Sequence, residues 1–151
     1  MTHAPMIRMA VPSDAQRIAD IARAAYAKYV ARIGREPAPM VADFPAAIAA
    51  GHVVVIEHAG AIQGYLVAWP EQDAYLLDNI AVDPAHEGKG LGRTLIHYAV
   101  AEARRRRLPA LRLYTNVAMA ENIAMYDHLG FVETHRVTEK GFDRVYMRRE
   151  L

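Results

Sequence analysis

The sequence of 151 residues contains no cysteine. Disulfides, thiolate zinc sites, iron–sulfur clusters and covalent intermediates on a cysteine are therefore excluded. The seven histidines show no spacing typical of metal ligands, so we expect no metal site. No stretch approaches the ~18 consecutive apolar residues of a membrane span, and residues 1–10 lack the basic and apolar regions of a signal peptide. These absences predict a cytoplasmic protein.

An excess of charge of one sign is also missing. The 18 lysine and arginine residues are balanced by 17 aspartate and glutamate residues, for a formal net charge of +1. This balance argues against a protein that works on nucleic acid or on an anionic membrane. The run Arg104–Arg107 is expected to end a helix, where cations favour the helix dipole, rather than to bind nucleic acid. We therefore expect neither nucleic acid nor a membrane among the partners.

Apolar residues are plentiful, at 53% of the chain. A chain of this size and composition can bury one core, so we expect a single domain over residues 1–151. Periodicity and turn signals predict the element order βααβββαβαββ, and hence a mixed α/β sheet with helices on both faces. The predicted strands are 6–11, 53–57, 62–69, 75–82, 111–115, 131–138 and 142–148, and the predicted helices are 15–33, 43–50, 91–107 and 119–129.

A glycine-dense loop is predicted between the strand 75–82 and the helix 91–107. It has the sequence His86-Glu87-Gly88-Lys89-Gly90-Leu91-Gly92-Arg93. Alternating glycines let the backbone approach a ligand closely, and the following helix adds the positive end of its dipole. We therefore interpret the loop as a cradle for a phosphate or pyrophosphate group rather than as a plain turn.

Three better-known motifs do not fit this loop. Its register is G-x-G-x-G, which differs from the dinucleotide fingerprint G-x-G-x-x-G. Lys89 is followed by Gly90 rather than by serine or threonine, which excludes the Walker pattern. The loop begins like the zinc motif H-E-x-x-H, but Gly90 stands where the second histidine is required.

The segment Leu77–Leu95 closely resembles the core motif of the GNAT superfamily, the acyl-CoA-dependent N-acyltransferases. The motif is an apolar strand that ends in Val-Asp-Pro and leads into (Gln/Arg)-x-x-Gly-x-(Gly/Ala). Here these parts are Val82-Asp83-Pro84 and Glu87-Gly88-Lys89-Gly90-Leu91-Gly92. Glu87 replaces the usual glutamine or arginine, which argues against a side-chain contact to pyrophosphate from that position. The backbone donors of the loop do not depend on Glu87.

A second GNAT signature lies further along the chain. The run 122–131, Asn-Ile-Ala-Met-Tyr-Asp-His-Leu-Gly-Phe, is similar to the family's Asn-to-Gly-Phe region. Asn122, Tyr126, Gly130 and Phe131 stand in the family's positions. The two separate motifs occur at the expected separation, and the predicted element order also matches the fold of this family over nearly the whole chain.

The resemblance implies a fold, a reaction and a cofactor. The implied fold class is α/β (α+β), with a mixed, mostly antiparallel central sheet of about seven strands splayed in a V and four helices on its two faces. The implied activity is an acetyl-CoA-dependent N-acetyltransferase that transfers acetyl directly to a primary amine in a ternary complex. A longer acyl group and a non-catalytic module that binds CoA are the alternatives.

The resemblance also assigns the residues that bind acetyl-CoA. Backbone groups of Ile80, Ala81 and Val82 would bond the pantetheine arm like an added strand. Asn122 and Tyr126 would contact the cofactor further along. The pyrophosphate would be held by the N–H groups of Gly88, Lys89, Gly90, Leu91, Gly92 and Arg93.

Transfer of acetyl to an amine requires groups that stabilise an oxyanion, protonate a thiolate and accept the amine proton. A backbone N–H near Ile80 can serve the oxyanion, and the resemblance makes Tyr126 the general acid. Asp78, a polar residue in an apolar strand, is the candidate general base. Alternatively, Asp78 stabilises a bulge in its strand. Glu36, Asp43 and a chain of water molecules are rivals for the base.

The acceptor is not named by the sequence. Family analogy places Tyr26, Tyr29 and Arg32 beside the acceptor pocket, although packing for the tyrosines and a solvated position for Arg32 are equally simple interpretations. Acceptor pockets are built from variable loops, so both small-molecule and peptide amines stay open. Many members of the family form dimers, and a homodimer is compatible with the resemblance.

Overall fold

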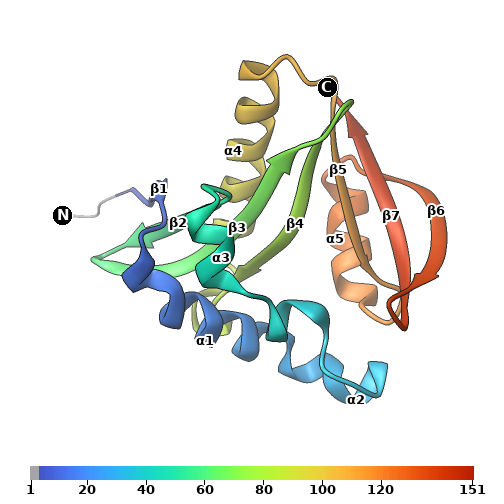
Figure 1. Ribbon diagram of the computed structural model, residues 1–151, viewed down its shortest axis with the longest axis horizontal. Coiled ribbons are helices and arrows are strands. Elements are labelled where there is room, and N and C mark those ends of the chain that lie inside the picture. Colours follow the sequence, from blue (N-terminus) through green and yellow to red (C-terminus); the bar gives the residue numbers. More distant parts are fainter. Residues whose placement is uncertain (1–3) are drawn as a thin grey trace. The chain divides into compact units, whose positions relative to one another are not determined.

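The order of helices and strands agrees with the order predicted from the sequence (Figure 1). The structure is a computed structural model that describes residues 4–151. Its elements are β1 (Met6–Met9), α1 (Ala15–Tyr26), α2 (Val30–Ile33), α3 (Phe44–Ala49), β2 (Val53–His58), β3 (Ala61–Pro70), β4 (Tyr75–Val82), α4 (Leu91–Arg105), β5 (Ala110–Asn116), α5 (Ala120–His128), β6 (Val132–Glu139) and β7 (Phe142–Glu150).

The seven strands form one sheet in the order β1-β2-β3-β4-β5-β7-β6. The β4–β5 pair is parallel, and the β1–β2, β2–β3, β5–β7 and β6–β7 pairs are antiparallel. The predicted mixed, mostly antiparallel sheet with four main helices is therefore confirmed; the V-shaped splay stays a prediction.

The chain divides into two compact units. Unit 1 contains the described part of Met1–Ala68 together with Asn79–Ile96, and unit 2 contains Trp69–Asp78 and His97–Leu151. The prediction of a single domain is not tested by this division. Within residues 4–151, no helix has the length and apolar character needed to cross a membrane.

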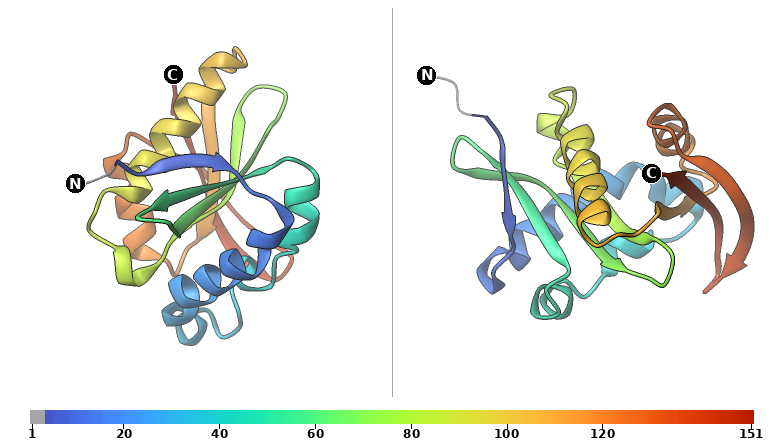
Figure 2. Two further views of the ribbon diagram at one scale, coloured as in Figure 1. Left: turned by 90° about the vertical axis from the view of Figure 1, so that its left-hand side faces the viewer. Right: turned by 90° about the horizontal axis from the view of Figure 1, so that it is seen from above.

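Unit 1 contains the β1-β2-β3 ladder and the helices α1 and α3, which contact each other. Its core includes Ile18 and Ile21 of α1, as the helical spacing predicts. The connection from β1 into α1 can be followed in both views of Figure 2. The predicted helix 15–33 is interrupted by a 3₁₀ turn at Ala27–Tyr29 before α2 continues to Gly34, which has a φ of +85°.

Asp14, at the start of α1, does not cap that helix through its side chain. Its carboxylate accepts hydrogen bonds from the Val11 N–H at 2.8 Å and from Arg8 at 2.8 and 3.1 Å. The bond from Arg8 lowers the pKa of Asp14. The carboxylate thus closes the 3₁₀ turn Pro12–Asp14 that precedes α1 and ties it to β1.

Unit 2 contains the end strands of the sheet and α5, which lies beside them (Figures 1 and 2). Leu111, Leu113, Val145 and Met147 alternate with polar residues and are fully or almost fully buried. The opposite face of β5 and β7 carries Arg112, Tyr114, Asn116, Arg144, Tyr146 and Arg148. The β6–β7 turn at Lys140 and Gly141 has φ values of +52° and +79°, as expected for a two-residue hairpin loop.

The α4 helix confirms the stripe that its sequence predicts. Leu91, Leu95, Ala99 and Ala103 recur every four residues, and all four are buried. The helix begins directly after the glycine loop, so the burial of this stripe fixes where its first turn lies.

Candidate functional site

The loop before α4 is anchored at Asp83, which follows the last residue of β4. The Asp83 carboxylate accepts a hydrogen bond from the Ala85 N–H at 3.0 Å and from Arg17 of α1 at 2.7 Å. Arg17 also donates to the Ile62 carbonyl of β3 at 3.0 and 3.1 Å. The bond from Arg17 lowers the pKa of Asp83, so this carboxylate stays ionised at neutral pH. The Val-Asp-Pro turn is thus tied to both a helix and a strand.

The glycine loop has the backbone geometry that a phosphate cradle needs. Gly88 and Gly90 have φ values of +79° and +78°, and a Cβ placed on either would meet no atom within 4 Å. The Gly90 carbonyl accepts hydrogen bonds from both the N–H and the hydroxyl of Thr94, each at 3.0 Å, which closes the first turn of α4. The N–H groups of this first turn have no intrahelical partners and can bind an anion.

Gly92 plays a different part from the other two glycines. It lies inside α4 with an ordinary φ, and a Cβ there would make a normal contact of 3.9 Å with Val82. The structure therefore requires glycine for backbone reasons at Gly88 and Gly90, but not at Gly92. Lys89 and Arg93 are exposed, and the Lys89 ammonium lies 3.1 Å from Nδ1 of His86.

Backbone groups of β4 alternate between its two edges. The Asp83 N–H donates to the Gln63 carbonyl of β3 at 2.8 Å. Alternation then turns the backbone of Ala81 toward β3 and that of Ile80 and Val82 toward the opposite edge. Of the three residues assigned to the pantetheine arm, Ile80 and Val82 therefore have their backbone groups on the edge away from β3.

Tyr26 reaches β4 from the end of α1. Its side chain is buried, and its hydroxyl donates to the Ile80 carbonyl at 2.8 Å. Tyr29 is only 2% exposed, and the guanidinium of Arg32, which is itself exposed, lies 5.3 Å from the Tyr29 ring. Within unit 1, Tyr29 is buried and the Tyr26 hydroxyl bonds the backbone at Ile80; the place of both residues beside an acceptor pocket stays a prediction.

Asp78, the candidate base, accepts a hydrogen bond from the Tyr114 hydroxyl of β5 at 2.6 Å. Asp78 is half-buried. Burial, and secondly the charge of Asp78, raise the pKa of Tyr114 well above its ordinary value, so the hydroxyl stays protonated and donates. The next residue, Asn79, is buried and accepts from the Tyr65 hydroxyl of β3 at 2.7 Å. Both polar residues of β4 therefore have specific partners.

Aromatic and charged side chains surround Tyr114 in unit 2. The Arg144 guanidinium lies 4.4 Å from the Tyr114 ring centre, and the Tyr146 ring lies 5.5 Å away. Arg144 pairs with Glu139 at 3.0 Å, and Glu139 also accepts a short hydrogen bond from Tyr146. Burial first, and then Glu139, raise the pKa of Tyr146. Arg112 stacks on Tyr146 at 4.5 Å and pairs with Glu71 at 3.0 Å.

Tyr126 is held by the turn that ends α5. Gly130, with a φ of +91°, reverses the chain, and the Phe131 N–H donates to the Tyr126 carbonyl at 3.0 Å. The rings of Tyr126 and Phe131 then meet edge to face at 5.7 Å, and both residues are buried. Asn122, one turn earlier, lies 3.7 Å from the sulfur of Met119. The spacing of Tyr126, Gly130 and Phe131 in the second GNAT signature thus follows from the turn that ends α5.

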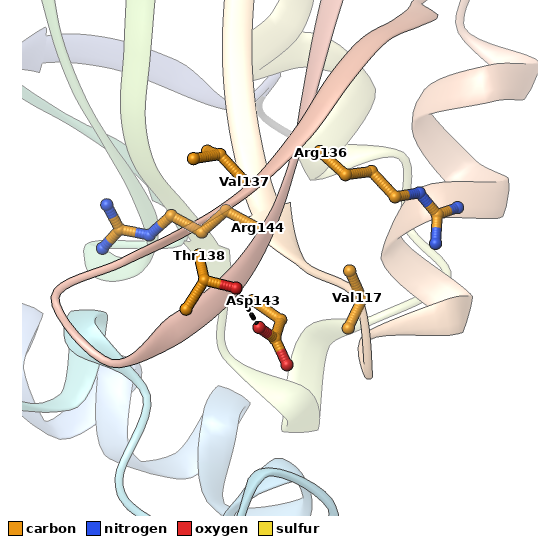
Figure 3. Close-up of a pocket in the computed structure, with 6 residues that line it drawn as sticks. All are labelled: Val117, Arg136, Val137, Thr138, Asp143 and Arg144. Atoms are coloured by element: carbon orange, nitrogen blue, oxygen red, sulfur yellow. Dashed lines mark hydrogen bonds between the residues drawn. The ribbon is translucent and has the colours of Figure 1, made fainter.

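A shallow cavity of about 340 Å³ lies where the β6–β7 hairpin meets the end of β5 (Figure 3). Its lining residues are Val117, Arg136, Val137, Thr138, Asp143 and Arg144. The Thr138 hydroxyl donates to Asp143 at 2.6 Å, while Arg136 and Arg144 extend in opposite directions. None of the predicted site residues lines this cavity.

The rival bases have other surroundings. Asp43 is exposed and caps α3 by accepting from the Ala46 N–H at 3.0 Å, as the sequence predicts. Glu36 is exposed.

Tyr114 was missed by the sequence argument. Alternation along β5 could have placed it opposite Leu113, but its pairing with Asp78 depends on the β4–β5 register, which only the fold supplies.

Residues 49–133 match the family described as Acetyltransferase (GNAT) domain, which is more than half of the chain. The chain belongs to the GNAT acetyltransferase family. The 5-NmdU N-acetyltransferase of Pseudomonas phage PaMx11 is 32% identical over 131 residues, which make up 83% of this chain and 86% of that protein. The recognition of a GNAT protein from its two motifs is therefore confirmed.

Other GNAT relatives match over different lengths. The ribosomal protein bS18-alanine N-acetyltransferase of Escherichia coli is 35% identical over 74 residues, 49% of this chain and 50% of that protein. The chain thus spans about half the length of the curated relatives that it matches in this way. The crystal structure of PaiA N-acetyltransferase from Thermoplasma acidophilum in complex with coenzyme A has a TM-score of 0.80 at 15% identity, covering 99% of this chain and 100% of that one. That likeness shows the fold.

Proposed function

We propose that this GNAT protein is an acetyl-CoA-dependent N-acetyltransferase that acetylates a primary amine by direct transfer in a ternary complex. The observation that carries the proposal is the glycine loop at the end of β4. Its two glycines with positive φ leave open space before the first turn of α4, whose N–H groups can bind a pyrophosphate. The exposed Lys89 and Arg93 add positive charge beside this space.

Acetyl-CoA, when bound, supplies an activated acetyl thioester. The N–H groups of Gly88 to Arg93 hold its pyrophosphate, and the edge of β4 at Ile80 and Val82 bonds the pantetheine arm. The Ile80 carbonyl accepts a hydrogen bond from Tyr26, and the Ile80 N–H is the proposed donor for the oxyanion. Asn122 contacts the cofactor further along.

Two side chains move the protons of the reaction. Asp78 takes the proton that the attacking amine loses, and Tyr126 donates a proton to the leaving sulfur. A tyrosine hydroxyl is a suitable donor because its ordinary pKa is near 10. No nucleophile of the enzyme is required, which agrees with the absence of cysteine.

For the molecule that receives the acetyl group, we propose only a chemical class. A carboxylate at Asp78 attracts an ammonium group before it accepts the proton, which favours primary amines. One relative is named for an alanine of a ribosomal protein and another for 5-NmdU. We therefore propose a small-molecule or peptide amine, in a cytoplasmic protein that does not use nucleic acid or membrane as a partner. A homodimer is a further proposal, which sedimentation can test.

A free-thiol release assay tests the function. The wild-type protein is given acetyl-CoA and a panel of peptide and small-molecule amines, and binding of acetyl-CoA is measured by calorimetry on the same sample. Release of thiol that depends on an amine supports the transferase. Tight binding of acetyl-CoA without amine-dependent release across the panel supports the non-catalytic CoA-binding module instead. That alternative is favoured by Glu87, which stands where the GNAT motif has glutamine or arginine. A protein that neither binds acetyl-CoA nor releases thiol would contradict both functions.

A further inference from the structure

Three consecutive residues of β4 each accept a hydrogen bond from a tyrosine hydroxyl. The pairs are Tyr114 with the Asp78 carboxylate (2.6 Å), Tyr65 with the Asn79 side-chain oxygen (2.7 Å) and Tyr26 with the Ile80 carbonyl (2.8 Å). The donors come from β5, β3 and α1. Such a bond fixes the direction of its acceptor. Where the tyrosine is buried, its ring has few alternative rotamers, so the hydrogen bond is rarely broken.

We propose that Tyr114 is a positioning residue that orients the Asp78 carboxylate for proton transfer during catalysis. This rests on the proposed function, in which Asp78 accepts the proton of the amine. A hydrogen bond donated to a carboxylate stabilises its charged form. Tyr114 therefore directs one oxygen of Asp78, while the second carboxylate oxygen is left to meet the acceptor.

Tyr114 is itself held in place by unit 2. The Arg144 guanidinium lies 4.4 Å from the centre of its ring, and Tyr146, the residue opposite on β7, lies 5.5 Å away. A guanidinium over the face of an aromatic ring is attracted to it. The ring is thus fixed by contacts that do not involve its hydroxyl, and removal of the hydroxyl alone should leave the ring in place.

The charged groups near this pair compensate one another. Arg144 on β7 pairs with Glu139 on β6, which also accepts from Tyr146, and Arg112 on β5 pairs with Glu71. Asp78, in contrast, accepts from a neutral hydroxyl. The hydroxyl of Tyr114 thus fixes the direction of the Asp78 carboxylate without adding a charge beside it.

Tyr65 provides a matched control. Its hydroxyl donates to the neighbouring residue of the same strand at nearly the same distance, but to the amide oxygen of Asn79, which does not titrate in this range. Tyr65→Phe and Tyr114→Phe each remove one hydroxyl from β4 and keep the ring. Only the second change should alter proton transfer.

The test is the pH dependence of kcat/KM for the acceptor in four proteins: wild type, Tyr114→Phe, Tyr65→Phe and Asp78→Asn. We expect the acidic limb of the Tyr114→Phe profile to move up by about one pH unit, because the charged carboxylate has lost a hydrogen-bond donor. The limb of Tyr65→Phe stays in place. Asp78→Asn loses the limb, and its kcat falls by about 10²-fold or more.

The outcomes separate the inference from the function on which it rests. An unmoved limb in a folded Tyr114→Phe protein, with the limb lost in Asp78→Asn, overturns the role of Tyr114 and keeps Asp78 as the base. A wild-type profile in Asp78→Asn overturns the base itself, and with it the role of Tyr114. An equal shift in Tyr65→Phe means that general loosening of β4 is responsible, which also overturns the inference.

A second variant covers the case in which Tyr114→Phe fails to fold. Site-specific 3,5-difluorotyrosine at position 114 keeps the ring and the hydroxyl but makes the hydroxyl a stronger donor. The acidic limb should then move to lower pH, opposite to the effect of phenylalanine. A limb that stays in place or moves upward with difluorotyrosine overturns the inference independently of the first variant.

Discussion

Asp78 lies in the middle of β4 and Asp83 follows its last residue, and partners of different charge hold the two carboxylates. Asp83 accepts from Arg17 at 2.7 Å, and this bond lowers its pKa. Asp78 accepts from the neutral hydroxyl of Tyr114 at 2.6 Å. A carboxylate tied to a cation is a fixed anion suited to shaping a loop, whereas one tied to a neutral donor is suited to exchanging a proton.

The comparison extends to what each carboxylate neighbours. Asp83 opens the glycine loop, where backbone N–H groups are the proposed binding groups. Asp78 belongs to unit 2, which also holds Tyr126, and there side chains are proposed to do the chemistry. Changes around Asp83 should therefore alter the affinity for acetyl-CoA, and changes around Asp78 should alter kcat. The predictions below test this division.

The largest effect is expected for Tyr126→Phe on the chemical side. Its ring packs edge to face on Phe131, and phenylalanine preserves that contact. The variant loses the proposed donor to the leaving sulfur, so kcat should fall by about 10²-fold while KM for acetyl-CoA stays nearly constant. Steady-state kinetics across pH measure both constants. A kcat within about twofold of wild type, with chemistry shown to be rate-limiting, would leave Tyr126 as a core aromatic only.

On the binding side, Gly90→Val should weaken CoA binding by at least about 1.4 kcal/mol, a tenfold effect. A Cβ at Gly90 would stand in open space directly before the first turn of α4, where the pyrophosphate is proposed to bind. Gly60→Val is the matched control: Gly60 has a φ of +79° and equally open surroundings, but it belongs to the β2–β3 turn. Calorimetry on both folded variants separates blocked binding from backbone strain. Equal affinities in the two variants would contradict the cradle.

These two predictions rest on parts of the protein that the sequence reveals to different degrees. The Asp83 turn and the glycine loop occupy one short stretch, and their conformation follows from local rules for glycine, proline and helix starts. The Tyr126 signature is equally local, because Gly130 turns Phe131 back onto the same helix end. Sequence analysis could predict these parts, and with them the order of the strands and helices.

The surroundings of Asp78 could not be predicted in this way. Tyr114 lies 36 residues further along the chain, and Arg144 and Tyr146 come from a third strand. Which of these side chains meet depends on the pairing of β4, β5 and β7 and on its register, and a shift of one residue would turn each of them to the other face.

A moderate effect is expected for Arg17→Met, which removes the cation beside Asp83. The depressed pKa of Asp83 means that this pair adds stability above the ordinary pKa of an aspartate, near 4, and that the contribution is lost as the pH falls through the lowered value. Arg17 is 40% exposed, so the loss at pH 7 should be at most about 1 kcal/mol. Urea unfolding at pH 7 and at acidic pH measures it.

The direction of this pH effect is the decisive part. The difference in unfolding free energy between wild type and Arg17→Met should shrink as the pH is lowered, since protonated Asp83 gains nothing from the arginine. The affinity for acetyl-CoA should fall severalfold with the loosened turn, while the pH profile of kcat keeps its shape. A displaced acidic limb in this variant would show that the two carboxylates are coupled and would break the division between them.

The smallest effect is expected for Glu87→Gln, at the position where this chain departs from the GNAT motif. Glu87 is exposed, and its charge lies in the loop proposed to hold an anionic pyrophosphate. Repulsion between unit charges about 8–10 Å apart in water is about 0.4–0.5 kcal/mol, so the variant should bind CoA about twofold more tightly at low salt. The gain should fade at high salt, where such interactions are screened.

Asp20→Asn, which removes the same charge from an exposed site on α1, should leave the affinity unchanged. Calorimetry at two salt concentrations measures all three proteins, and weaker binding by Glu87→Gln would mean that the glutamate makes a favourable contact of its own.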